Sequence, residues 1–206
     1  SRDTFVALRG GQRWLQHFEA QPLTQEHARR ALRPGGVYLI TGGLGQLGFA
    51  IASQLAVSAK AKLVLTGRTP LPLPTERQRW LDEHDASNPV SVRIRRVQDL
   101  EELGAEVLAV SADVADEVAM RAVLKQTTDR FGDLHGVIHA AGLIEGGAIF
   151  LPLQQMGVVE SERQFGPKAR GLYVLQRVLA GRALDVRYIV SSNAAACRPT
   201  NLPHAV

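Results

Sequence analysis

Hydrophobic residues from position 37 onward gather in short runs that alternate with longer stretches of mixed polarity. Each run is four to six residues long and consists mainly of β-branched or aliphatic residues. Continuous apolarity of this kind is typical of strands that are buried on both faces of a sheet. The predicted strands are VYLIT (37–41), KLVLT (62–66), EVLAVS (106–111), GVIHA (136–140) and RYIVS (187–191).

The stretches between these runs have apolar positions at helical spacing. In the last of them we expect Leu172, Leu175 and Leu179 to share one face of a helix. Repeated strand-helix-strand units predict an α/β fold, namely a Rossmann-like doubly wound parallel sheet with helices on both faces. We expect the C-terminal part of that fold to be missing from this chain. The predicted helices occupy 45–58, 90–104, 117–132 and 167–181.

Two segments depart from this alternation. Residues 1–36 contain strand-like sequence on either side of a Gly-Gly pair and end in a Pro-Gly-Gly break, so we interpret them as a lead-in segment from something longer. The stretch of about 70–88 has prolines at 70, 72 and 74, which predict an extended surface insertion. Within it we expect a short helix capped at Thr75, with Trp80 as its packing anchor.

Composition narrows the possible functions. The net charge of +4 favours anionic partners, but the basic residues are dispersed and only 5% of residues are aromatic, which argues against nucleic-acid binding. We expect the basic run at Arg93, Arg95 and Arg96 to be a solvated helix face. The single Cys197 precludes an internal disulfide, and no metal site is predicted. With no spanning segment or signal peptide in evidence, we expect no membrane association and a cytoplasmic location.

The stretch VYLITGGLGQLGFAIA carries the strongest chemical signal. A strand runs directly into closely spaced glycines and then into a helix. Glycine permits the tight turn and lets backbone N–H groups approach a pyrophosphate, which the helix N-terminus also attracts. We therefore predict a dinucleotide site here rather than a plain glycine-rich turn. Its residues are Thr41, Gly42, Gly43, Leu44, Gly45, Gln46, Leu47 and Gly48.

The end of the second predicted strand indicates which dinucleotide binds. NAD-binding proteins usually place an acidic residue there, on the ribose 2′-hydroxyl. Here LVLTGR has no acid and ends in Arg68. Because a guanidinium suits a 2′-phosphate, we predict NADPH as the cofactor. A solvated loop arginine is the alternative interpretation.

The third and fourth predicted strands end in SADVAD and HAAG, at the sheet edge where open parallel sheets bind ligands. We expect the Asp113 carboxylate to accept a hydrogen bond from the adenine amino group of the dinucleotide. We expect Val114 to pack on the adenine ring. The alternative for Asp113 is a helix cap near Asp116. His139 is more typical of a buried structural histidine than of a catalyst. Small residues that would let the nicotinamide half approach the backbone are Ala140, Ala141 and Gly142.

Taken in order, the motifs TGGLGQLG, TGR, ADV, HAAG, PKARGL and SS resemble the short-chain dehydrogenase/reductase superfamily. More closely, they resemble the ketoreductase domains of modular type I polyketide synthases, over Val37 to about Ser192. The resemblance implies that residues 1–36 lead in from a structural subdomain. It also implies that 37–206 form an NADPH-binding catalytic subdomain, incomplete at its C-terminus.

The same resemblance implies an activity and partners. NADPH would reduce a β-ketoacyl chain, tethered by phosphopantetheine to an acyl carrier protein, to the β-hydroxyacyl form. Other domains of the same megasynthase would be further partners. Ser192 would hold the carbonyl, and Lys168, which precedes it by 24 residues, would orient the ribose. The alternatives are a solvated helix lysine and a serine bonded to local backbone.

One departure from the family bears on activity. The family's tyrosine is expected thirteen residues after Ser192, where this chain has Ala205, and the expected asparagine is also not found. Two interpretations of the chain follow. It is either an incomplete piece of a working reductase or a catalytically inactive structural ketoreductase that retains the cofactor-binding fold. The complete set of cofactor motifs favours the first. The sequence leaves the hydroxyl stereochemistry and the polyketide product open.

Overall fold

The structure is a computed structural model that describes residues 6–15, 19, 32–142 and 153–191. The chain divides into two compact units, Ser1–Ala31 and Leu32–Val206. In the first unit, β1 (Val6–Arg9) pairs antiparallel with β2 (Gln12–Leu15). Gly10 and Gly11 join them with φ values of 55° and 75°, the left-handed conformation that a two-residue hairpin turn requires. The strand-like sequence around the Gly-Gly pair is therefore a hairpin.

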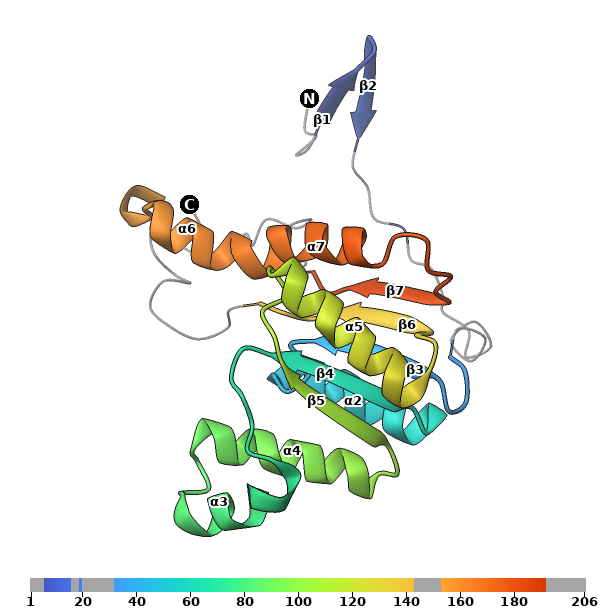
Figure 1. The fold of residues 1–206 in the computed structure, drawn as a ribbon. Coiled ribbons are helices and arrows are strands. Elements are labelled where there is room, and N and C mark those ends of the chain that lie inside the picture. The colour runs from blue at the N-terminus through green and yellow to red at the C-terminus, as the bar shows by residue number, and fades with distance from the viewer. Residues whose placement is uncertain (1–5, 16–18, 20–31, 143–152, 192–206) are drawn as a thin grey trace. The chain divides into compact units, whose positions relative to one another are not determined.

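The second unit is built on a parallel five-stranded sheet (Figure 1). Its strand order is β5-β4-β3-β6-β7, and every neighbouring pair is parallel. The order reverses between β3 and β6, which is the point where doubly wound sheets bind ligands. All five predicted strands are confirmed. Their bounds are β3 (Val37–Thr41), β4 (Lys62–Gly67), β5 (Glu106–Ser111), β6 (Gly136–His139) and β7 (Val186–Ile189).

Helices cover both faces of this sheet, as predicted (Figure 1). On β3, Tyr38 and Ile40 pack into one core with α2 and α4, whereas Val37 and Leu39 pack into the opposite core with α5 and α7. This alternation buries the whole strand, which is why its sequence is continuously apolar. The covering helices are α2 (Gln46–Ala59), α4 (Pro89–Glu102), α5 (Glu117–Phe131) and α7 (Gly171–Val178).

The predicted helix over 167–181 is not one regular α-helix. A π-helical turn, η4 (Gly166–Arg170), precedes α7 and changes its phase. Leu172, Leu175 and Leu179 nevertheless share one face, as predicted, because all three line the same surface hollow. Leu175 and Leu179 are buried, whereas Leu172 is 37% exposed. The buried stripe of α7 is formed by Gly171, Val174, Leu175 and Val178.

The stretch 70–88 contains a 3₁₀ turn, η1 (Pro74–Glu76), followed by α3 (Arg77–Glu83), which packs on α4. The predicted cap at Thr75 is wrong, because this residue lies inside η1 and the N-cap position of α3 is Glu76. Trp80 stacks on His84 with ring centroids 3.8 Å apart. The remaining described elements before the π turn are η3 (Leu153–Gln155) and α6 (Val158–Phe165).

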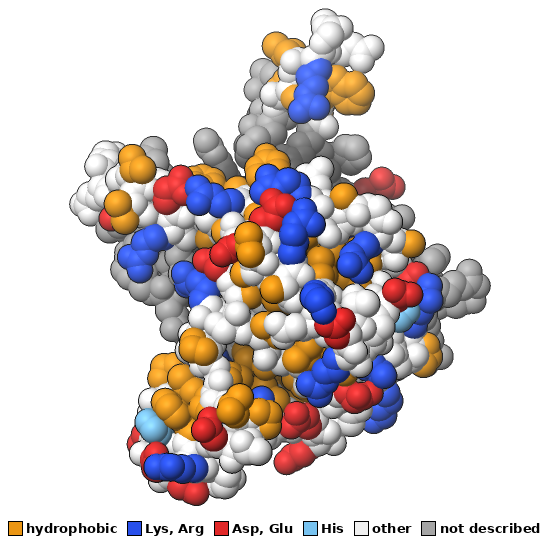
Figure 2. All heavy atoms as spheres, in the orientation of Figure 1, with side chains coloured by type: hydrophobic (Ala, Val, Ile, Leu, Met, Phe, Trp, Pro, Cys, Tyr) orange, Lys and Arg blue, Asp and Glu red, His pale blue; other side chains and the backbone are white. Residues whose placement is uncertain are grey.

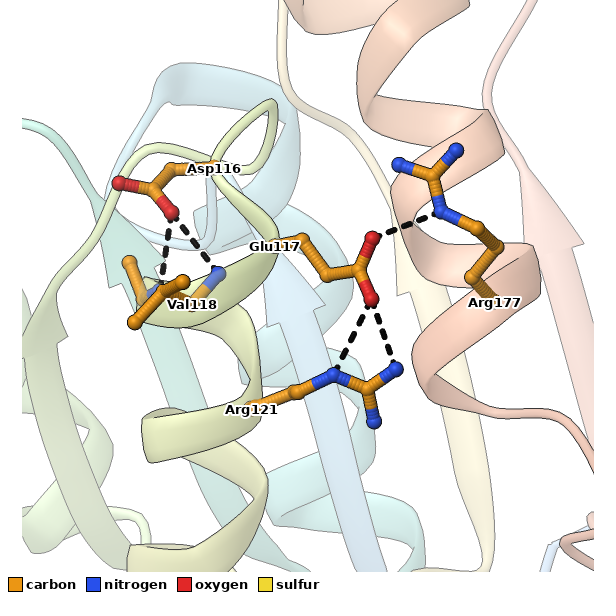
Figure 3. Close-up of polar contacts among 6 residues, drawn as sticks. Asp116, Glu117, Val118, Arg121 and Arg177 are labelled. Atoms are coloured by element: carbon orange, nitrogen blue, oxygen red, sulfur yellow. Dashed lines mark hydrogen bonds and ion pairs between the residues drawn. The ribbon is translucent and has the colours of Figure 1, made fainter.

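Helices α5 and α7 are tied together by a polar cluster (Figure 3). Glu117 at the start of α5 accepts hydrogen bonds from Arg121 of the same helix and, at 2.7 Å, from Nε of Arg177 on α7. The bonds from Arg121, assisted by Arg177, hold the pKa of Glu117 below its usual value. The bond from Arg177 to Glu117 therefore links α7 to α5. Elsewhere on the face in Figure 2, Lys and Arg side chains are interspersed with Asp and Glu.

Candidate functional site

The glycine-rich segment between β3 and α2 is clamped between two neighbouring strand ends. The Gly42 N–H donates to the Thr66 carbonyl at the end of β4, at 2.8 Å. Gly42 has φ of 68°, and a Cβ there would lie 2.8 Å from the Ala140 carbonyl oxygen and 2.9 Å from Cα of Ala141. Only glycine allows this approach, so the loop and the segment after β6 form one continuous backbone surface.

Helix α2 begins without a side-chain cap. Its N-cap is Gly45, and the first bond within the helix runs from the Phe49 N–H to the Gly45 carbonyl at 2.9 Å. The N–H groups of Gln46, Leu47 and Gly48 therefore have no partner inside the helix. Free donors at a helix N-terminus, aligned with the helix dipole, attract an anion.

A cleft runs along this edge of the sheet from the glycine-rich segment to the ends of β4, β5 and β6. It brings together most of the nucleotide-binding residues predicted from the sequence. Thr41 and Gly43 are buried behind it rather than exposed to it. The predicted residues that line the cleft are Gly42, Leu44, Gly45, Gln46, Leu47, Gly48, Arg68, Asp113, Val114, Ala140, Ala141 and Gly142.

Arg68 occupies the rim of the cleft just beyond β4. Its backbone is fixed by Ser111, whose hydroxyl donates to the Arg68 carbonyl at 3.0 Å, and by the adjacent bond from the Ala112 N–H to the Gly67 carbonyl. The side chain is exposed, and no carboxylate among the described residues pairs with it. An uncompensated guanidinium on a ligand cleft is suited to binding a phosphate.

Asp113 and Val114 follow β5, the strand next to β4, and line the same cleft as Arg68. Asp113 Oδ1 accepts from the Ala115 N–H at 2.9 Å, whereas Asp116 caps α5 by accepting from the N–H groups of Val118 and Ala119 (Figure 3). The alternative interpretation of Asp113 as the helix cap is therefore wrong. Val114 is buried against α7, because a Cβ at Gly171 would lie 2.7 Å from its Cγ1.

Thr41 and His139 form a buried pair beneath the cleft. They face each other across β3 and β6, and the Thr41 hydroxyl is hydrogen-bonded to His139 Nδ1 at 2.7 Å. His139 is only 4% exposed, and burial lowers its pKa, against an opposing effect from the backbone of Lys168 and Pro167. The pair joins the two strands at the point where the strand order reverses, which agrees with a structural histidine.

The burial of His139 predicts a pH-dependent stability. Because its pKa in the folded state lies below the ordinary value of 6.5, the unfolded chain binds the proton first as the pH falls. Stability should therefore be complete above pH 6.5 and decrease below it, by at most about 1.4 kcal/mol per pH unit, until the folded-state pKa is reached. Urea unfolding between pH 5 and 8 measures this slope, and His139→Gln should flatten it. An equal slope in both proteins contradicts the prediction.

Lys168 lies beside the cleft rather than in its lining. It belongs to the π-helical turn, its side chain is exposed, and its Cε is 3.6 Å from the position that a Cβ on Gly142 would occupy. The preceding Pro167 lines the cleft, a contact that the sequence did not indicate. Ser192 lies outside the described residues. The Val190 N–H bonds to the His139 carbonyl at 2.9 Å, so the chain is still paired with β6 two residues earlier.

The prediction that Arg93, Arg95 and Arg96 form a solvated helix face is wrong. All three are half-buried on α4. Arg93 lines the cleft, and Arg96 Nη1 donates to the Leu44 carbonyl in the glycine-rich segment at 2.5 Å. Arg93 and Arg96 are three residues apart and lie beside the apolar stripe of α4, so the sequence did indicate that they share one side of the helix. The target of that face is 52 residues away in the chain, so sequence pattern alone did not indicate it.

Comparison with known proteins identifies the family. A family model described as the KR domain matches residues 36–202. The chain belongs to the ketoreductase (KR) domain family of polyketide synthases. KR domains are reductases of the short-chain dehydrogenase/reductase superfamily, which generally use NADH or NADPH. The resemblance found in the sequence motifs is thus confirmed.

Several relatives define how far this likeness extends. Over 195 residues the KR domain is 33% identical to polyketide synthase PksM of Bacillus subtilis (strain 168), covering 95% of this chain and 4% of that protein. An N-terminal ketoreductase from the macrolactin assembly line aligns with TM-score 0.68 at 30% identity, covering 89% of this chain and 32% of its own. A ketoreductase domain from the bacillaene assembly line aligns with TM-score 0.72 at 26% identity, covering 94% of this chain and 41% of that chain.

Two further findings concern the part of the KR domain that the structure describes. None of its helices is both long enough and apolar enough to cross a bilayer. Nor does it contain three or more His, Cys, Asp or Glu side chains grouped so that they would hold a metal ion.

Proposed function

We propose that this KR domain catalyses the NADPH-dependent reduction of a β-ketoacyl chain to the β-hydroxyacyl form. The acyl chain is carried on the phosphopantetheine of an acyl carrier protein, and the KR domain works alongside other domains of a polyketide synthase. The observation that carries the proposal is the cleft itself. It combines an uncapped helix N-terminus at Gly45 with the guanidinium of Arg68, which pairs with no carboxylate in the part of the chain that the structure describes.

The residues present fit a phosphorylated dinucleotide. The close backbone packing of Gly42 leaves the N–H groups at the start of α2 accessible to a pyrophosphate. We assign the ribose 2′-phosphate to Arg68 and the adenine amino group to the carboxylate of Asp113, with Val114 beneath the ring. Residues 140–142 are two alanines and a glycine, whose small side chains permit the nicotinamide half of the cofactor to approach the backbone closely.

NADPH, when bound, would supply the hydride that reduces the ketone, and a proton taken up from water would complete the hydroxyl group. We propose that Ser192 donates a hydrogen bond to the substrate carbonyl oxygen, holding the carbon in position and stabilising negative charge on the oxygen. We propose that Lys168 orients the ribose. Support for this role comes from its place beside the cleft, where its Cε lies 3.6 Å from the position that a Cβ on Gly142 would occupy.

Replacing Arg68 tests the cofactor assignment. Arg68→Ala should weaken NADPH binding by about 10- to 100-fold, because a charge-assisted hydrogen bond contributes about 1.5–3 kcal/mol. NADH, which lacks the 2′-phosphate, should bind the variant as it binds the original protein. Fluorescence titration with both nucleotides measures the ratio. Equal affinity for NADPH and NADH in the unaltered protein would contradict the assignment.

The reaction is tested with the polyketide synthase module that contains this KR domain. Given NADPH and a β-ketoacyl thioester, it should oxidise the nucleotide and form one β-hydroxyacyl product per NADPH consumed, measured by absorbance and mass spectrometry. If NADPH binds but no product forms, the domain is a non-catalytic scaffold and the proposed reduction is wrong.

A further inference from the structure

Three arginines on α4 make three different contacts. Arg95 Nη1 donates to the Ala86 carbonyl at 3.0 Å, away from the cleft. Arg96 Nη1 donates to the Leu44 carbonyl, within the glycine-rich segment. Arg93 lines the cleft together with Arg68, and its described contact is a 3.1 Å hydrogen bond from Nη1 to the Pro89 carbonyl of its own helix. Of these three arginines, Arg93 is therefore the one that lines the cleft.

Helix α4 is held firmly against this site. Besides its bond to Leu44, the Arg96 guanidinium lies over the Phe49 ring, with Cζ 5.3 Å from the centroid. Phe49 belongs to the first turn of α2, so Arg96 contacts both the glycine-rich segment and the helix that follows it. Arg93, one turn earlier on α4, is thereby kept at a fixed place on the cleft wall.

The charge balance of the cleft favours an anion near Arg93. Its charged lining residues are Arg68, Arg93 and Asp113, so two cations face one carboxylate. Asp113 already accepts from the Ala115 N–H and forms no ion pair with either arginine among the described contacts. A guanidinium carries several N–H donors, and Arg93 uses one nitrogen for Pro89. Donors therefore remain for a ligand.

We propose that Arg93 is a second specificity-determining residue, binding the ribose 2′-phosphate together with Arg68. This inference rests on the proposed NADPH site. A phosphate monoester carries close to two negative charges and three acceptor oxygens, which suits two guanidinium groups from different walls of one cleft. Arg68 comes from the loop after β4 and Arg93 from α4, so the phosphate is held between two independent elements.

Two nucleotides that differ in one phosphate test the proposal. Calorimetric titration of the full chain with 2′,5′-ADP and with 5′-AMP isolates the 2′-phosphate. Arg93→Met should weaken 2′,5′-ADP about 10-fold, as expected for the loss of one charge-assisted hydrogen bond, and leave 5′-AMP unchanged. Arg93→Lys should restore part of the difference, since it keeps the charge. Arg95→Met is the matched control on the same helix and should change neither affinity.

The outcomes separate this proposal from the one it rests on. If Arg68→Ala removes the preference for 2′,5′-ADP but Arg93→Met does not, Arg93 has no such role and the NADPH assignment stands. If Arg93→Met weakens both nucleotides equally, it acts elsewhere than on the 2′-phosphate, which also overturns the inference. If the unaltered protein binds both nucleotides equally, the NADPH assignment itself fails. Thermal unfolding verifies that each variant is folded, and Arg93→Gln replaces any Met variant that is not.

Discussion

Gly48→Ala should reduce nucleotide affinity by at least about 100-fold, equivalent to roughly 2.7 kcal/mol of binding free energy. A Cβ at this position would lie 2.3 Å from the Gly42 carbonyl oxygen and 2.8 Å from Cα of Gly43. Both are backbone atoms, so no side chain can rotate away and the loop must separate from the helix. That movement displaces the N–H groups at the start of α2, which are the donors proposed for the pyrophosphate.

Gly48→Ala also has two opposing effects on the stability of the fold, and thermal unfolding tests which of them is larger. Alanine in place of a helical glycine normally stabilises a helix by up to about 1 kcal/mol, whereas forcing an atom into a filled site costs about 1–3 kcal/mol. At Gly48 the clash is with backbone, so we expect net destabilisation in thermal unfolding. Gln54→Ala is the control, because Gln54 is an exposed residue of the same helix that does not line the cleft. Unchanged nucleotide affinity in Gly48→Ala would refute the proposed role of this packing.

The fold and the centre of the cleft were predictable because their signals are local. Five continuous apolar runs predicted the strands, and a strand followed by glycines and a helix predicted the loop. Parallel strands end at one edge, so residues after β4, β5 and β6 were expected to meet, and Arg68, Asp113 and Ala140 do line one cleft.

Features that depend on distant partners were not predictable in this way. The sequence pattern of α4 predicts a solvated face at Arg93 and Arg96, because that pattern does not show which segments pack beside the helix. What lies beside them belongs to other parts of the chain, because Arg93 lines the cleft and Arg96 bonds to Leu44 in the glycine-rich segment. Likewise, the π turn before α7 contains a wider turn than the 3.6-residue period, so the sequence pattern predicted a single α-helix over 167–181.

Lys168→Met should reduce the rate of ketone reduction by about 10²-fold or more, because a ribose that is no longer oriented misplaces the nicotinamide relative to the ketone. Lys168 is exposed beside the cleft, near Gly142, and no carboxylate among the described residues pairs with it. Its ammonium group is therefore available to a ligand. Methionine keeps a side chain of similar length and removes only the charge and its donors.

The measurement that separates a catalytic role from a structural one is the split between turnover and binding. Lys168→Met in the module should lower kcat strongly while the NADPH dissociation constant, measured by fluorescence, changes less than about threefold, under 1 kcal/mol. Lys125→Met is the matched control, because Lys125 pairs with Asp129 on the exposed side of α5. It should leave both quantities unaltered. If Lys168→Met retains the original turnover, Lys168 is a solvated helix lysine, and the proposed assignment must move to another residue.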